Sequence, residues 1–250
     1  MNYTFSKKIL NKRAVLLAHG DKELTSNKDI MRMYRFLTSP YGGCWNKNEI
    51  SYGINIPKAQ LLYTIQQLKY ENLDYLLVYF SGHGGYRDET ILELNTKQEV
   101  IYERQLNQIA QRQLNIFDCC RAIDDGLSGI DDTRVFSADE YNIAIIRNIF
   151  DTRLFQAAPQ QMSLYACKIG ECAYDKGNGG LFTNGLLNMA TNDFGKQFLL
   201  VSEACQHSAN LLLTQKQHPC IKMSVLPTAK QLIFAVNPNQ ILRTNYTKMF

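Results

Sequence analysis

Short, nearly unbroken apolar runs recur along the chain, separated by stretches in which apolar residues return at helical spacing. The runs occupy residues 13–18, 74–80, 114–117, 161–167 and 232–236. Runs of this length that are rich in β-branched and aromatic residues are typical of strands buried on both faces. They predict the strands of a mostly parallel sheet.

The intervening stretches predict helices near residues 26–37, 57–68, 102–111, 181–190 and 198–213. Pro57 suits the first position of the second helix, and Pro40 with the glycines after it ends the first. Weaker patterns predict a strand over 45–52 and a small hairpin outside the main sheet, formed by 90–94 and 100–102. The β-α alternation predicts helices on both faces of the sheet.

Composition narrows the functional classes. The chain has 250 residues, enough for one large α/β domain or two small ones. Lys plus Arg number 27 against 23 Asp plus Glu, with no basic block, which argues against a nucleic-acid partner. No apolar stretch approaches the length of a membrane span or an export signal, and the odd count of seven cysteines indicates reduced thiols. We therefore expect a cytoplasmic protein without a membrane anchor.

Reactive side chains follow two of the apolar runs. His83 stands among glycines after the run at 74–80, and Cys119 and Cys120 follow the run at 114–117. The carboxyl ends of parallel strands share one edge of a sheet, where α/β proteins place their sites. A histidine there can activate a thiol, and backbone N–H groups of a glycine-rich turn can hold an oxyanion. Neighbouring strand residues point in opposite directions, so only one of the two cysteines can face the histidine.

The two motifs together resemble the caspase-like cysteine peptidases: caspases, paracaspases and metacaspases. Residues 79–84 (Tyr-Phe-Ser-Gly-His-Gly) are similar to their histidine strand, and residues 118–120 (Asp-Cys-Cys) are closest to the Asp-x-Cys pattern of metacaspases. The resemblance implies Cys120 as nucleophile, His83 as general base and acid, and the backbone N–H groups of Gly84 and Cys120 as oxyanion donors. It also implies a three-layer α-β-α fold around a mostly parallel, six-stranded sheet.

The substrate pocket follows from the same resemblance. Metacaspases bind the residue before the scissile bond through positions that match Asp118, Asp29 and Ser81 here. Two carboxylates in one concave site favour a guanidinium or an ammonium group. We therefore expect protein or peptide substrates that are cut after Arg or Lys rather than after Asp.

A weakly patterned segment divides the chain. Residues 122–160 contain turn-forming, acidic stretches and predict a long exposed connector, which in compact domains tends to be functional. The resemblance makes 1–121 a large-subunit-like part, 161–250 a small-subunit-like part, and the connector a segment cut when a zymogen is activated. The candidate self-cleavage sites in it are Arg134, Arg147 and Arg153.

Other interpretations stay open from the sequence. A catalytically silent caspase-like module, acting through a regulatory partner, would share this fold. A nucleotide-binding protein is disfavoured because Gly82-x-Gly84 lacks the rest of a dinucleotide fingerprint. No cofactor is required, and no zinc-ligand spacing links Cys205, His207, His218 and Cys220. The acidic pairs leave room for calcium at Asp124, Asp125, Asp131 and Asp132, and the oligomeric state is open.

Overall fold

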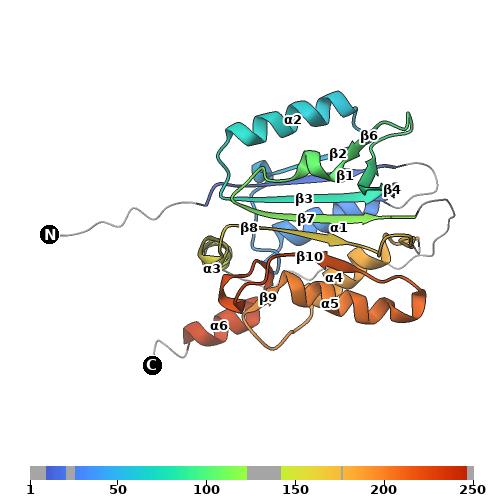
Figure 1. Ribbon diagram of the computed structural model, residues 1–250. Helices are drawn as coiled ribbons and strands as arrows, with labels where there is room; N and C mark the ends of the chain where they lie inside the picture. The colour runs from blue at the N-terminus through green and yellow to red at the C-terminus, as the bar shows by residue number, and fades with distance from the viewer. Residues whose placement is uncertain (1–9, 21–25, 123–141, 176, 247–250) are drawn as a thin grey trace.

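The protein is described by a computed structural model (Figure 1) that covers residues 10–20, 26–122, 142–175 and 177–246. Its centre is a six-stranded sheet with strand order β10-β8-β7-β3-β1-β2. Five strands run parallel and one, β10, runs antiparallel to its neighbour β8. The bounds are β1 Lys12–Ala18, β2 Ile50–Ile54, β3 Tyr75–Gly82, β7 Arg112–Cys119, β8 Gln160–Tyr165 and β10 Cys220–Lys222. The fold class expected from the sequence is thus confirmed.

Alternating residues of the strands feed two cores. In β1, Ala14, Leu16 and Ala18 enter one core, while Val15 and Leu17 enter the other, as the two-residue period of a strand requires. The first core is covered mainly by four helices, with Ile241 near the C-terminus also packed into it, and the second by one helix and a small sheet (Figure 1). The helices of the first are α1 Ser26–Thr38, α3 Ile143–Gln156, α4 Leu181–Thr191 and α5 Val201–Leu212. The second lies under α2 Lys58–Tyr70 and strands β4 Gly84–Arg87, β5 Glu89–Glu93 and β6 Val100–Tyr102.

The register of the central strands brings distant residues to one edge. Along the β3–β7 pair, Ser81 lies opposite Asp118 and Gly82 opposite Cys119. On the other side of β3, Ala18 lies opposite Ser81. His83 and Cys120 are the next residues along β3 and β7, so they leave the sheet side by side at its carboxyl edge.

The connection between β3 and β7 differs from the prediction. The hairpin expected from 90–94 and 100–102 is present as β5 and β6, with β4 paired to the free side of β5. The helix expected over 102–111 is wrong, because the chain forms only a 3₁₀ turn at Glu103–Leu106. The buried side chain of Gln113 accepts a hydrogen bond from Ile109 N at 2.8 Å and donates one to Leu106 O, so it replaces the backbone bonds of a helix.

The second half of the predicted connector also differs from the prediction. Residues 143–156 form α3, where the sequence predicted an exposed connector. Ile146, Phe150 and Leu154 form a buried stripe that packs into the first core, although Ile143 and Ile145 are exposed. A charged contact adds to this packing, with Arg147 paired to Glu49. Residues 123–141 lie outside the described residues.

The C-terminal strands were only partly predicted. The strand expected at 232–236 is β11, Ile233–Val236, but it pairs with β9, Phe198–Leu200, in a separate two-stranded sheet. The sixth strand of the main sheet is β10, whose three residues are too few to show a pattern. The last described helix is α6, Pro238–Tyr246. No helix in the described ranges is both long and apolar enough to span a bilayer.

Candidate active site

The structure distinguishes the two adjacent cysteines. Cys119 is 1% exposed and turns toward β4, where a Cβ added to Gly84 would lie 2.7 Å from its Sγ. Cys120 is half-buried beyond the last residue of β7, with its Sγ 3.6 Å from the carbonyl oxygen of Ala173. His83 is half-buried beyond β3. Cys120 is therefore the more exposed of the two thiols at this end of β7, and its assignment as the nucleophile remains a prediction from the family motif.

The Cys120 thiol is held in its protonated form. Burial, with smaller contributions from Cys172 and Asp118, raises the pKa of this thiol to about 12 in spite of a lowering by the Ala173 backbone. Only the thiolate is a nucleophile, so a thiol in this environment needs a base that removes its proton as it reacts. The predicted base is His83, which follows β3, the strand paired with β7.

The backbone at Gly84 is oriented for an oxyanion. Gly84 lies opposite Leu92 in the β4–β5 ladder, and the bond at this point runs from Glu93 N to His83 O at 3.1 Å. In an antiparallel ladder this makes Gly84 and Leu92 a non-hydrogen-bonded pair, so the N–H of Gly84 points away from β5. An N–H group directed out of the ladder at this edge can be aimed at a developing negative charge.

Asp29 and Asp118, which we call the acidic pair, are almost completely buried, at 1% and 4% exposure. Asp29 Oδ2 accepts hydrogen bonds from Ser81 Oγ at 2.8 Å and from Gly180 N at 3.0 Å. Asp118 Oδ2 accepts from both the backbone N and the Oγ1 of Thr183, at 3.0 and 2.6 Å. The three residues predicted for the pocket are thus brought together, on α1, β3 and β7.

Burial and their closeness make it unfavourable for both carboxyl groups of the acidic pair to be ionised. Burial raises the pKa of Asp118 to about 6, partly offset by the bonds from Thr183. Burial and the charge of Asp118 together raise the pKa of Asp29 well above its usual range, because two close carboxylates cannot both ionise cheaply. Among the described residues, none donates a hydrogen bond to the buried Oδ1 of Asp29.

Two glycines cover the acidic pair. A Cβ on Gly179 would lie 1.9 Å from Asp29 Oδ1, and a Cβ on Gly180 would lie 2.0 Å from Asp118 Oδ2. Any larger residue would collide with the carboxylates, so the segment 179–183 can seat on them only because it begins with glycines. Arg32 holds this cover from outside, donating to Asn178 O at 2.7 Å.

Comparison with known proteins defines the family. The sequence profile of the caspase domain matches residues 11–229. This chain belongs to the caspase domain family. The crystal structure of a Geobacter sulfurreducens protein is similar in fold, with a TM-score of 0.60 and 15% identity over 90% of this chain and 99% of that one. None of the curated proteins matches the chain.

Two of the three predicted self-cleavage sites are unsuitable for cleavage in the folded domain. Arg147 lies within α3 and donates to Glu49 Oε2 at 2.8 Å and to Cys44 O at 3.0 Å. Arg153, in the same helix, is 9% exposed and donates to Thr228 O at 3.1 Å. A protease needs an extended, accessible segment, so neither arginine is a cleavage site in the folded domain. Arg134 lies outside the described residues.

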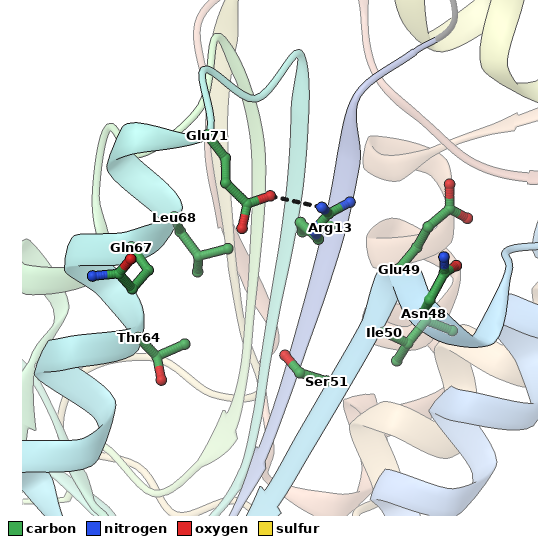
Figure 2. Close-up of a pocket in the computed structure, with 9 residues that line it drawn as sticks. All are labelled: Arg13, Asn48, Glu49, Ile50, Ser51, Thr64, Gln67, Leu68 and Glu71. Carbon is green, nitrogen blue, oxygen red and sulfur yellow. Dashed lines mark ion pairs between the residues drawn. The ribbon is translucent and has the colours of Figure 1, made fainter.

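No metal site emerges from the described part of the chain, in which no three acidic, histidine or cysteine side chains converge. His218 pairs with Glu171 at 2.8 Å. The acidic residues considered for calcium, 124–132, lie outside the described residues. The cavity in Figure 2, of about 200 Å³, lies between α2 and the start of β2 and is bordered by an ion pair of Arg13 with Glu71. It is at the amino end of the strands, opposite the dyad.

Sequence reasoning missed three contributors to this edge. Thr183 binds Asp118 and also shares a 2.7 Å hydrogen bond with the buried Tyr79 hydroxyl, which links the acidic pair to the core. Gly180 supplies a backbone donor to Asp29. His19, after β1, packs against His83. The glycine pair was visible in the sequence as a turn, but which carboxylates it would cover depends on the tertiary fold.

Proposed function

We propose that this caspase-domain protein is a cysteine endopeptidase that cuts protein substrates after Arg or Lys. Cys120 is the nucleophile, and His83 is the general base and acid. The family supports peptidase chemistry. The placement of the thiol and the imidazole beyond adjacent parallel strands supports the assignment of these two residues to it.

The proposed reaction follows from the groups at this edge. His83 takes the proton from the Cys120 thiol while the sulfur attacks the carbonyl carbon of the scissile bond. The negative charge on the carbonyl oxygen is held by the N–H groups of Gly84 and Cys120. The C–N bond then breaks, and His83 returns its proton to the leaving amine. Water, deprotonated by His83, hydrolyses the thioester and restores the thiol.

The observation that supports the substrate preference is the buried acidic pair. A carboxylate oxygen without a donor, in a site where burial and like charge disfavour ionisation, would be stabilised by a guanidinium or ammonium group. A negatively charged substrate residue would add a third negative charge to the same site. This electrostatic asymmetry favours Arg or Lys and excludes Asp.

The form described by the structure is a resting form in this proposal. The acidic pair is covered by residues 179–183, so a substrate cation reaches it only when this segment moves. Binding would exchange the hydrogen bonds from Gly180 and Thr183 for those of the substrate. Such an exchange fits a peptidase whose activity depends on a further signal, and we include that dependence in the proposal.

Matched peptides that differ only in having Arg, Lys or Asp before the scissile bond test the substrate preference. We expect the Arg and Lys peptides to be turned over by the wild type but not by Cys120→Ala or His83→Ala. Asp118→Asn should also lose this turnover, while its Cys120 still reacts with a small alkylating agent. Preference for the Asp peptide would refute the substrate class. No turnover, combined with no labelling of Cys120 by an Arg-based peptidyl electrophile, would instead support a catalytically silent module.

A further inference from the structure

His19 ends the strand next to His83 and contacts it directly. The two imidazole rings meet edge to face, with centroids 5.0 Å apart and planes at 76°. His19 is 3% exposed, and its backbone N–H donates to Ser81 O at 3.0 Å, which extends the β1–β3 ladder up to His83. A buried ring at this position limits how the His83 imidazole can turn.

Three neighbours fix the position of His19 itself. Ser26 Oγ donates to the carbonyl oxygen of His19 at 2.5 Å. The Nδ1 of His19 lies 3.7 Å from Glu93 Oε1. Gly82 has a φ of +151°, and a Cβ there would come within 2.8 Å of the Cβ of His19. The close approach of the two histidines therefore depends on a glycine between β3 and His83.

Glu93 connects the two histidines from the other side. Its backbone N donates to the carbonyl oxygen of His83, while its carboxylate faces the ring of His19. One residue of β5 thus bonds the main chain of the proposed base and places its carboxylate 3.7 Å from the Nδ1 of the neighbouring His19. The three residues form a unit drawn from β1, β3 and β5.

We infer that His19 is a positioning residue whose buried ring, packed edge to face against His83, holds the His83 imidazole in the orientation that removes the Cys120 proton. This inference rests on the proposed function of His83. It does not require His19 to exchange a proton with the substrate. Misplacement of a reacting group by about 1 Å can lower a rate about 100-fold, and general base catalysis is worth about 100- to 10,000-fold in total. Loss of the ring should therefore slow the reaction about 10- to 100-fold.

The rate at which iodoacetamide alkylates Cys120, followed by mass spectrometry at neutral pH, tests the inference without requiring peptidase activity. We expect His19→Ala to slow alkylation about 10- to 100-fold, because its His83 no longer favours the reactive orientation. His19→Phe, which keeps a flat ring, should restore most of the rate. His207→Ala, which removes a histidine from α5, is the matched control and should react like the wild type.

A double-mutant cycle separates positioning from a general loss of structure. If His19 acts only through His83, then His19→Ala should have no further effect in a His83→Ala background. Alkylation of His19→Ala at the wild-type rate, or additive effects in the cycle, would overturn the inference. If His19→Ala does not fold, as judged by circular dichroism, Glu93→Gln keeps the ring but removes the carboxylate charge that faces it. It should slow alkylation to a smaller degree, again only when His83 is present, and an unchanged rate in this variant would overturn the inference.

These results are independent of the substrate assignment. If the peptide assays alone fail, the proposed peptidase activity is rejected. The alkylation rate of His19→Ala relative to that of the wild type tests only whether His19 positions His83. Where peptides are turned over, His19→Ala should lower kcat and leave KM nearly unchanged, because His19 does not touch the substrate.

Discussion

The acidic pair makes a prediction that links stability to function. The perturbation is Asp118→Asn, which keeps the shape of the side chain and removes its charge. In the wild type, burial raises the pKa of Asp118 to about 6, whereas an unfolded aspartate has a pKa of about 3.9. A carboxyl whose folded pKa is raised favours the folded state below the unfolded pKa, and this contribution is lost as the pH rises through the folded pKa.

The magnitude follows from the two pKa values. A difference of about two pKa units corresponds to about 3 kcal/mol of lost stability once the pH is well above 6. About 2 kcal/mol of this loss falls between about pH 4.5 and about pH 8. The asparagine does not titrate, so its carbonyl oxygen can accept from Thr183 at either pH. We therefore expect Asp118→Asn to gain about 2 kcal/mol relative to the wild type across this range.

Urea unfolding at the two pH values measures this difference, and the comparison with wild type cancels the titration of all distant groups. In thermal melts, the same gain corresponds to about 4–8 °C in Tm for a chain of this size. The variant should at the same time lose turnover of Arg peptides. If the difference in unfolding free energy between wild type and variant is the same at both pH values, the burial argument is refuted. Such a result would mean that the carboxylate is ionised without cost.

Three further predictions concern the segment 179–183 that covers the acidic pair, the Cys120 thiol and the predicted connector. Gly179→Ala should destabilise the fold by more than Gly195→Ala, because both glycines have positive φ but only the first would place its Cβ against the acidic pair; equal unfolding free energies would contradict this. Cys172→Ala should lower the pKa of Cys120 and speed its alkylation at mildly alkaline pH, since Cys172 raises that pKa; a slower reaction would contradict it. Aged protein analysed by mass spectrometry should be cut after Arg134 and not within α3, and the Cys120→Ala protein should stay intact; the same fragments in both would rule out self-processing.

The architecture was largely predictable because strands buried on both faces leave an unbroken apolar signal. β1, β3, β7 and β8 were located to within a few residues from such runs. The predicted helix at 102–111 failed because the side chain of Gln113, two residues beyond it at the start of β7, binds the backbone of Leu106 and Ile109. α3 was missed because the exposed Ile143, Ile145 and Phe155 obscure its buried stripe, so apolar residues occur on more than one face of the helix.

The candidate site could be predicted from the sequence less completely than the fold. The thiol, the imidazole and the two carboxylates are reactive types that a motif can identify. The register of β3 and β7 brings Asp118 and Cys119 opposite the end of β3, and Asp29 of α1 reaches the same edge through its hydrogen bond from Ser81. Their supports cannot be identified in that way, because Thr183 and Gly180 are ordinary residues of a turn and a helix start. His19 carries a signal of its own, an imidazole after a buried strand, yet its meaning depends on β1 lying next to β3. Strand order is set by how the whole chain packs, so the residues that hold a site in position become recognisable only with the fold.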